Sequence, residues 1–150
     1  DGRDKSELTS NKRRLRQKWE ELFFGRVVDA VDELAGEHHS NQSPILEMMK
    51  LVSIKSMYKS KAEEKRIVMI SDMLQHTRRY SHYKTTPDFS NFNATPYSIE
   101  QKPQLSDVDV EILYLIRGKD ILRQNRGHIS FWEQYVSTAG GLITRVKTIN

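Results

Sequence analysis

The fold class follows from the stretch Arg66-Ile67-Val68-Met69-Ile70-Ser71-Asp72-Met73-Leu74-Gln75-His76. Its four consecutive apolar residues stop abruptly at Ser71-Asp72. A short apolar run of this kind, without alternation, predicts a strand buried on both faces of a parallel sheet. Ligands of open parallel sheets bind beyond the carboxyl ends of the strands. Ser71 and Asp72 would lie there, and their oxygens are groups that handle a hard cation or a phosphate.

The composition predicts one globular domain, residues 1–150, with 37% apolar and 29% charged residues. The chain has no cysteine, which excludes disulfides, thiolate zinc sites and cysteine nucleophiles. Its net charge of +4 permits contact with nucleic acid but does not require it. No apolar run in the sequence approaches the roughly 20 residues of a membrane span, and no signal-peptide core is readable. With the lack of cysteine, this favours the cytoplasm.

Two helices are expected before the apolar strand. Apolar residues recur at three- and four-residue steps over residues 11–34, which predicts an amphipathic helix packed on a sheet. Ser43 and Pro44 then open a second helix, with the serine as its cap and the proline at its first position. The strand 66–71 follows this helix.

The second half of the chain continues the alternation of helices and strands. Residues 84–106 are rich in Thr, Pro, Asn and Ser without periodicity, which predicts a long loop of the kind that serves as a lid, a partner-binding loop or a mobile insertion. Strand 110–116 comes next, then a largely helical segment 119–138 that Gly127 interrupts, and a half-buried edge strand 142–146. This order predicts an α/β fold: a three-layer parallel sheet with helices on both faces.

At this point the residues carry a family resemblance. Ser43-Pro44-Ile45, a helix, and a strand closing on Ser71-Asp72-Met73-Leu74-Gln75 resemble the C-terminal half of a von Willebrand factor A-like domain. The resemblance is to uncharacterised bacterial members whose strand ends in SDMLQ. Trp19-Glu20-Glu21-Leu22-Phe23 and Phe131-Trp132 also resemble those members, so the similarity spans most of the chain. It implies a Rossmann-like fold and a non-catalytic protein–protein interaction module.

The resemblance also implies a metal-ion-dependent adhesion site for Mg²⁺ or Mn²⁺. In that family three loops supply hydroxyl and carboxylate ligands, and Ser43 and Asp72 match the second and third of them. The first, a D-x-S-x-S sequence after a strand, does not occur here. The resemblance therefore implies that the first strands of the fold lie outside this sequence and that the site is incomplete. Around it, the resemblance implies a rim or partner-binding surface formed by Ser71, Gln75, His76, Arg78, Arg79 and Tyr83.

The missing strands have a physical consequence. Strand 67–70 would lack a neighbour on one edge, and an unpaired apolar edge invites pairing with another chain. We therefore expect a homodimer, an exchange of elements, or pairing with an N-terminal fragment.

Other interpretations of the same residues stay open. Ser43 can simply cap its helix and Asp72 the turn after the strand. A phosphoryl-transfer or nucleic-acid-binding protein would instead use Asp72 with Arg78 and Arg79 on phosphates, although nucleic acid is not the partner that we expect. A structural module without a ligand is the third alternative.

Two further groups of residues are discounted as sites. The five histidines, of which His76 is nearest Asp72, are expected to be solvated loop side chains rather than zinc ligands. Asp107 and Asp109 precede their strand, so we expect them at the opposite end of the sheet from Asp72, too far for two-metal chemistry.

Overall fold

A computed structural model describes residues 41–84 and 86–149. These residues belong to one compact unit, Asn41–Asn150. The helix expected over residues 11–34 and the first two histidines, His38 and His39, lie outside the described residues. Within the part of the chain that the structure describes, no helix is both long and apolar enough to cross a membrane.

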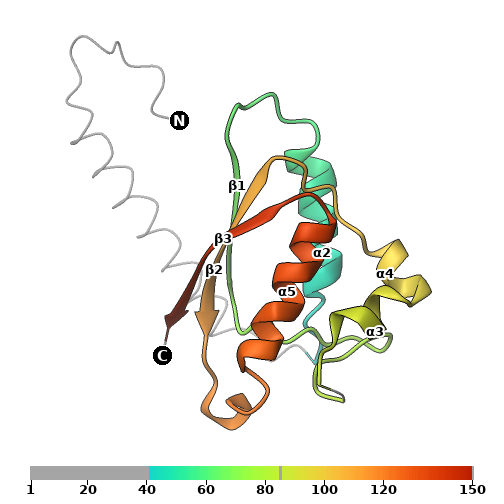
Figure 1. Ribbon diagram of the computed structural model, residues 1–150, viewed down its shortest axis with the longest axis vertical. Helices are drawn as coiled ribbons and strands as arrows, with labels where there is room; N and C mark the ends of the chain where they lie inside the picture. The colour runs from blue at the N-terminus through green and yellow to red at the C-terminus, as the bar shows by residue number, and fades with distance from the viewer. Residues whose placement is uncertain (1–40, 85, 150) are drawn as a thin grey trace, which may run out of the picture. The chain divides into compact units, whose positions relative to one another are not determined.

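The centre of the fold is a three-stranded parallel sheet in the order β1-β2-β3 (Figure 1). Its strands are β1 (Lys65–Ser71), β2 (Val108–Leu115) and β3 (Leu142–Ile149). The predicted α/β class and parallel sheet are confirmed, and each strand is found where the sequence indicated, with ends that differ by at most three residues. In the register of the sheet Ser71 lies opposite Tyr114, so β1 and β2 end together.

The described helices cover one face of this sheet. Every second residue of β2 is buried, from Val108 to Tyr114, so its buried side chains all point to the same face. Helices α2 (Ile45–Val52) and α5 (Arg126–Thr138) share one hydrophobic core with that face, as Figure 1 illustrates. The described residues therefore form two layers, and a third layer of helices is not among them.

Strand β1 is less buried than its sequence suggested. Arg66 and Val68 are exposed and alternate with the partly buried Ile67 and Met69. The expectation that β1 is buried on both faces is thus wrong for the described residues. Its apolar run resembles that of a central strand, but helices of the described region cover only the Ile67–Met69 side.

The segment 84–106 is not a structureless loop. It contains two short helices, α3 (Phe89–Asn93) and α4 (Pro96–Glu100). The Asp88 side chain caps α3 by accepting a hydrogen bond from the Asn91 N–H at 2.7 Å. Thr95 caps α4 in the same way, with Pro96 in its first turn. Cap residues, not hydrophobic periodicity, are the signal that predicts helices this short.

Two predicted helix starts are also corrected. Ser43 does not cap α2, because Pro44 occupies the cap position and no side chain caps this helix; the Ser43 backbone exchanges two hydrogen bonds with His76 at 2.7 and 2.9 Å. Helix α5 begins at Arg126 after a cap by Asn125, so Gly127 lies in its first turn and does not interrupt it. The first residues of the predicted helical segment 119–138 do not belong to α5. They are part of a short 3-10 turn, Gly118–Asp120.

Candidate functional site

The turn after β1 holds the two residues singled out by the sequence. Ser71 accepts a hydrogen bond from the Met73 N–H at 3.0 Å, and Asp72 Oδ1 accepts one from the Leu74 N–H at 3.0 Å. These bonds support Met73, which has a φ of +56°, a left-handed conformation that is uncommon for a residue with a side chain. The alternative in which Asp72 caps this turn is confirmed.

The second oxygen of Asp72 is also engaged. Its Oδ2 lies 2.7 Å from Nε of Arg117, which follows β2, and only 6% of the Asp72 side chain is exposed. An arginine guanidinium is permanently charged and satisfies a buried carboxylate without any metal. Ser43 is held through its backbone to His76 and has no bond to Asp72 among the described residues. As they stand, Ser43 and Asp72 do not fit a cation, which would first have to displace Arg117.

No other group of described side chains suggests a metal centre. Within residues 41–84 and 86–149 there is no cluster of three or more histidine or carboxylate side chains that could hold an ion. Asp107 and Asp109 lie at the amino ends of the strands, where Asp109 is the register partner of Arg66 in the sheet. Asp72 lies at the opposite, carboxyl end.

Gln75 and His76 hold the turn against α2 instead of forming an open rim. Gln75 is fully buried, and its side chain accepts from the Leu46 N–H at 3.0 Å and donates to Glu47 at 3.1 Å. The His76 ring makes a 2.8 Å hydrogen bond with the Ser81 hydroxyl. Both polar side chains therefore serve the packing of this segment.

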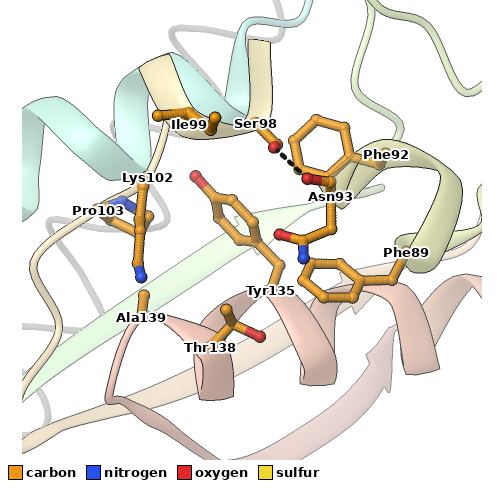
Figure 2. A pocket seen from close by; sticks show the side chains of 10 residues that line it. All are labelled: Phe89, Phe92, Asn93, Ser98, Ile99, Lys102, Pro103, Tyr135, Thr138 and Ala139. Atoms are coloured by element: carbon orange, nitrogen blue, oxygen red, sulfur yellow. Dashed lines mark hydrogen bonds between the residues drawn. The ribbon is translucent and has the colours of Figure 1, made fainter. Parts of the chain in front are cut away.

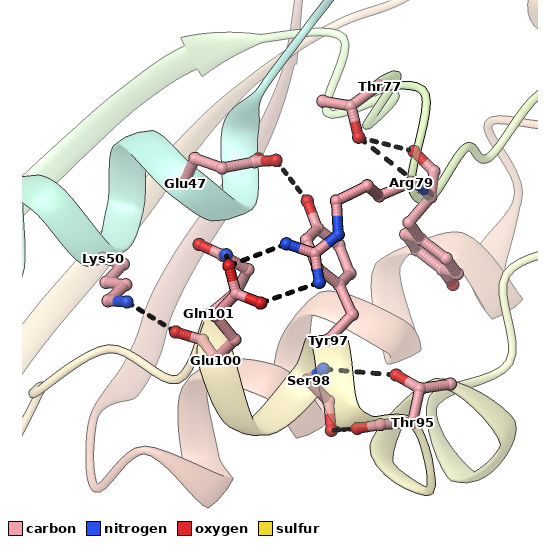
Figure 3. Close-up of polar contacts among 10 residues, drawn as sticks. Glu47, Lys50, Thr77, Arg79, Thr95, Tyr97, Ser98, Glu100 and Gln101 are labelled. Atoms are coloured by element: carbon pink, nitrogen blue, oxygen red, sulfur yellow. Dashed lines mark hydrogen bonds and ion pairs between the residues drawn. The ribbon is translucent and has the colours of Figure 1, made fainter.

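Arg78 and Arg79 do not act as a pair. Arg79 makes two 2.7 Å bonds to the Glu100 carboxylate and lies 4.5 Å above the Tyr97 ring, so it joins the 77–80 turn to α4 (Figure 3). These hydrogen bonds lower the pKa of Glu100 and raise that of Arg79. Arg78 is exposed. A phosphate at Arg79 would have to compete with a carboxylate that already binds it at two points.

Tyr83 lies beside a hollow at the carboxyl end of the sheet. The Arg123 guanidinium is 5.6 Å from the centre of its ring and pairs with Asp120 at 3.1 Å. The hollow, about 370 Å³, opens between the segment after β1 and residues 122–125 after β2, and Lys84 adds a second cation to its wall. It occupies the place where ligands of parallel sheets bind.

A buried polar network lies beneath this end of the sheet. His128 Nε2 is 3.0 Å from the Met73 carbonyl and 3.0 Å from His82 Nδ1, and His128 Nδ1 is 2.5 Å from the Tyr114 hydroxyl. Trp132 donates to the same Met73 carbonyl at 3.0 Å. The network therefore fixes the carbonyl of the one residue in the turn that has a left-handed backbone.

Both histidines are neutral at pH 7. Burial lowers the pKa of His82 to about 3, assisted by His128, and lowers that of His128 to about 4. None of His128 is exposed, and His82, of which 1% is exposed, lies in the wall of the 370 Å³ hollow. The expectation that these histidines are solvated is wrong. The signal was present for His128, which precedes Phe131 and Trp132 by three and four residues and so shares their buried face of α5.

The site thus resolves into a tightly capped turn, an Asp72–Arg117 ion pair and a neutral histidine pair, all serving structure. Comparison with protein-family models, with curated proteins and with solved structures finds no match to this chain. The resemblance to a von Willebrand factor A-like domain accordingly rests on the quoted residues alone.

Proposed function

We propose that this chain is a non-catalytic protein–protein interaction module that receives, along the edge of β1, a strand from a second copy of the chain. The observation that carries the proposal is the position of β1 at the end of the sheet. Among the described residues it pairs with β2 on one side and with no strand on the other. Its seven residues are long enough to present a full row of backbone donors and acceptors.

The chemistry of this edge favours a strand as its occupant. Val68 is 40% exposed on the face opposite the core, and Ile67 and Met69 lie on the other face. An added strand would satisfy the backbone groups and cover apolar side chains of β1 on both faces. The resemblance to a family of interaction domains supports the same conclusion.

The catalytic alternative has less support. Asp72 and Arg79, two of the three residues that it would use, are each bound to an opposite charge. The buried histidines are neutral at pH 7, and neither belongs to the residues that this alternative would use.

A lysine on β1 should weaken association. Because an inward-facing or edge charge opposes strand pairing, we expect Val68→Lys in the full chain to raise the dissociation constant for self-association at least about tenfold, a change of about 1.4 kcal/mol. Sedimentation velocity over a concentration series measures this constant.

The matched control is Thr148→Lys, which places the same charge on an exposed position of β3 at the opposite edge. It should associate like the wild type. Equal weakening by the two variants, or a wild-type chain that stays monomeric at every concentration, contradicts the proposal.

A divalent cation at the end of β1 is a separate and conditional part of the proposal. Because Arg117 occupies the Asp72 carboxylate, Mg²⁺ or Mn²⁺ should bind only when that arginine is removed. We expect Arg117→Gln to bind Mn²⁺ in calorimetry with millimolar affinity, about −4 kcal/mol, and the wild type to bind it less tightly. Arg117→Gln combined with Asp72→Asn should lose this binding. Binding that is equal in all three proteins would remove Asp72 from the site.

A further inference from the structure

A second hollow lies between α3, α4 and the last turn of α5, and no residue of β1 lines it (Figure 2). Its volume is about 350 Å³. A cavity of about 150 Å³ lined by apolar side chains is large enough for benzene, so this one accommodates an aromatic ring together with a short chain. The same volume lies within the range of small-molecule sites.

The inner wall of this cavity is apolar. The rings of Phe92 and Tyr135 are almost fully buried behind it, and Phe89 forms one side. Ile99, at the rim, is 77% exposed, an unusual position for a large aliphatic side chain beside a hollow. An apolar ligand would cover Ile99 and contact the aromatic rings.

One uncompensated charge faces this apolar wall. Lys102 lines the cavity, and its ammonium group makes no ion pair with any described residue. The neighbouring Lys50 differs, since it donates to the Glu100 carbonyl at 2.6 Å. None of the lining side chains is acidic. The electrostatic character of the cavity therefore favours an anion.

Two of the three hydroxyl groups that line the cavity, those of Tyr135 and Ser98, already donate hydrogen bonds to backbone carbonyls. Tyr135 donates to the Gln101 carbonyl at 2.7 Å, and Ser98 donates to the Asn93 and Thr95 carbonyls at 2.9 and 2.8 Å. The Asn93 amide and the Thr138 hydroxyl are the other neutral polar side-chain groups of the lining, so the ligand can make a small number of further polar contacts. A single anionic group on an apolar body matches this wall.

We propose that this cavity binds a small organic acid, whose aromatic or branched apolar body fills the hollow and whose carboxylate contacts Lys102. The proposal is independent of the β1 edge, because no residue of β1 lines the cavity.

The test is a titration of the full, isotope-labelled chain with 3-phenylpropionate, followed by two-dimensional NMR. We expect saturable shifts of the Phe92, Tyr135 and Ala139 amides with a dissociation constant of about 1 mM or lower. The neutral analogue 3-phenylpropan-1-ol should bind about fivefold more weakly, since an exposed ion pair contributes up to about 1 kcal/mol.

Two variants separate the charge from the cavity. Lys102→Met should remove the preference for the acid, whereas Lys119→Met, which changes an exposed lysine outside the cavity, should keep it. Thr138→Trp, at an exposed lining position, should block both compounds by filling the space. The proposal is overturned by the absence of saturable shifts at these amides. It is also overturned if Lys102→Met binds acid and alcohol with the same ratio as the wild type.

Discussion

Replacing Trp132 with alanine should lower the free energy of unfolding by about 3–5 kcal/mol, the usual cost of truncating a fully buried tryptophan. The side chain is 1% exposed and packs against Phe131 and Tyr135 at ring-centre distances of 5.3 and 5.7 Å. It also donates to the Met73 carbonyl. Because native domains are stable by about 5–15 kcal/mol, this loss should remove a large part of the stability of the chain. Urea denaturation followed by circular dichroism measures it.

Two controls divide this effect into packing and hydrogen bonding. Trp132→Phe keeps most of the ring volume and removes the bond to Met73, so it should cost about 1–2 kcal/mol. Leu122→Ala, at a position that is 88% exposed, should change the free energy by less than about 0.5 kcal/mol. An alanine variant at Trp132 that is as stable as the one at Leu122 contradicts the described core.

Acid should destabilise the chain through its two buried histidines. Their pKa values in the folded state, about 3 for His82 and about 4 for His128, lie below the usual histidine value of 6.5. Between the folded-state pKa values and 6.5, the unfolded chain binds protons that the folded chain does not. The contribution of the two histidines to the free energy of unfolding is therefore fully present above pH 6.5 and falls as the pH decreases. Each histidine contributes up to about 1.4 kcal/mol per pH unit, so the loss from pH 6.5 to 4.5 should be about 3–5 kcal/mol.

Urea denaturation at a series of pH values measures this slope. His82→Phe removes one of the two titrating groups and should reduce the slope to about half. A free energy of unfolding that is constant from pH 7 to 5 would show that the histidines are not buried as neutral groups.

Strand positions were predictable because they depend on local pattern. The apolar run 67–70 and the alternation in 142–146 each correspond to an observed strand. The short helices α3 and α4 were not predictable from periodicity, because five residues are too few to display it. Their capping residues Asp88 and Thr95 were the available signal.

The candidate site was predictable only in part. Asp72 was placed correctly at the carboxyl end of β1, but its partner Arg117 lies 45 positions further along the chain and carries no sequence signal of the pairing. The same is true of His82 and His128, whose rings are in hydrogen-bonding contact. His82 lies in the connection between β1 and β2, and His128 in the connection between β2 and β3. Residue type alone did not distinguish a solvated histidine from a buried one.

The sequence by itself determined the α/β class, the three parallel strands and the polar turn that follows the first of them. These depend on interactions between near neighbours: the alternation of side chains, the helical period and the preferences of capping residues. Only the tertiary structure decided that Arg117 neutralises Asp72 and that two histidines are buried and neutral. Each of those depends on which distant groups the folded chain brings within a few ångströms, since burial and charge pairing are set by the final packing.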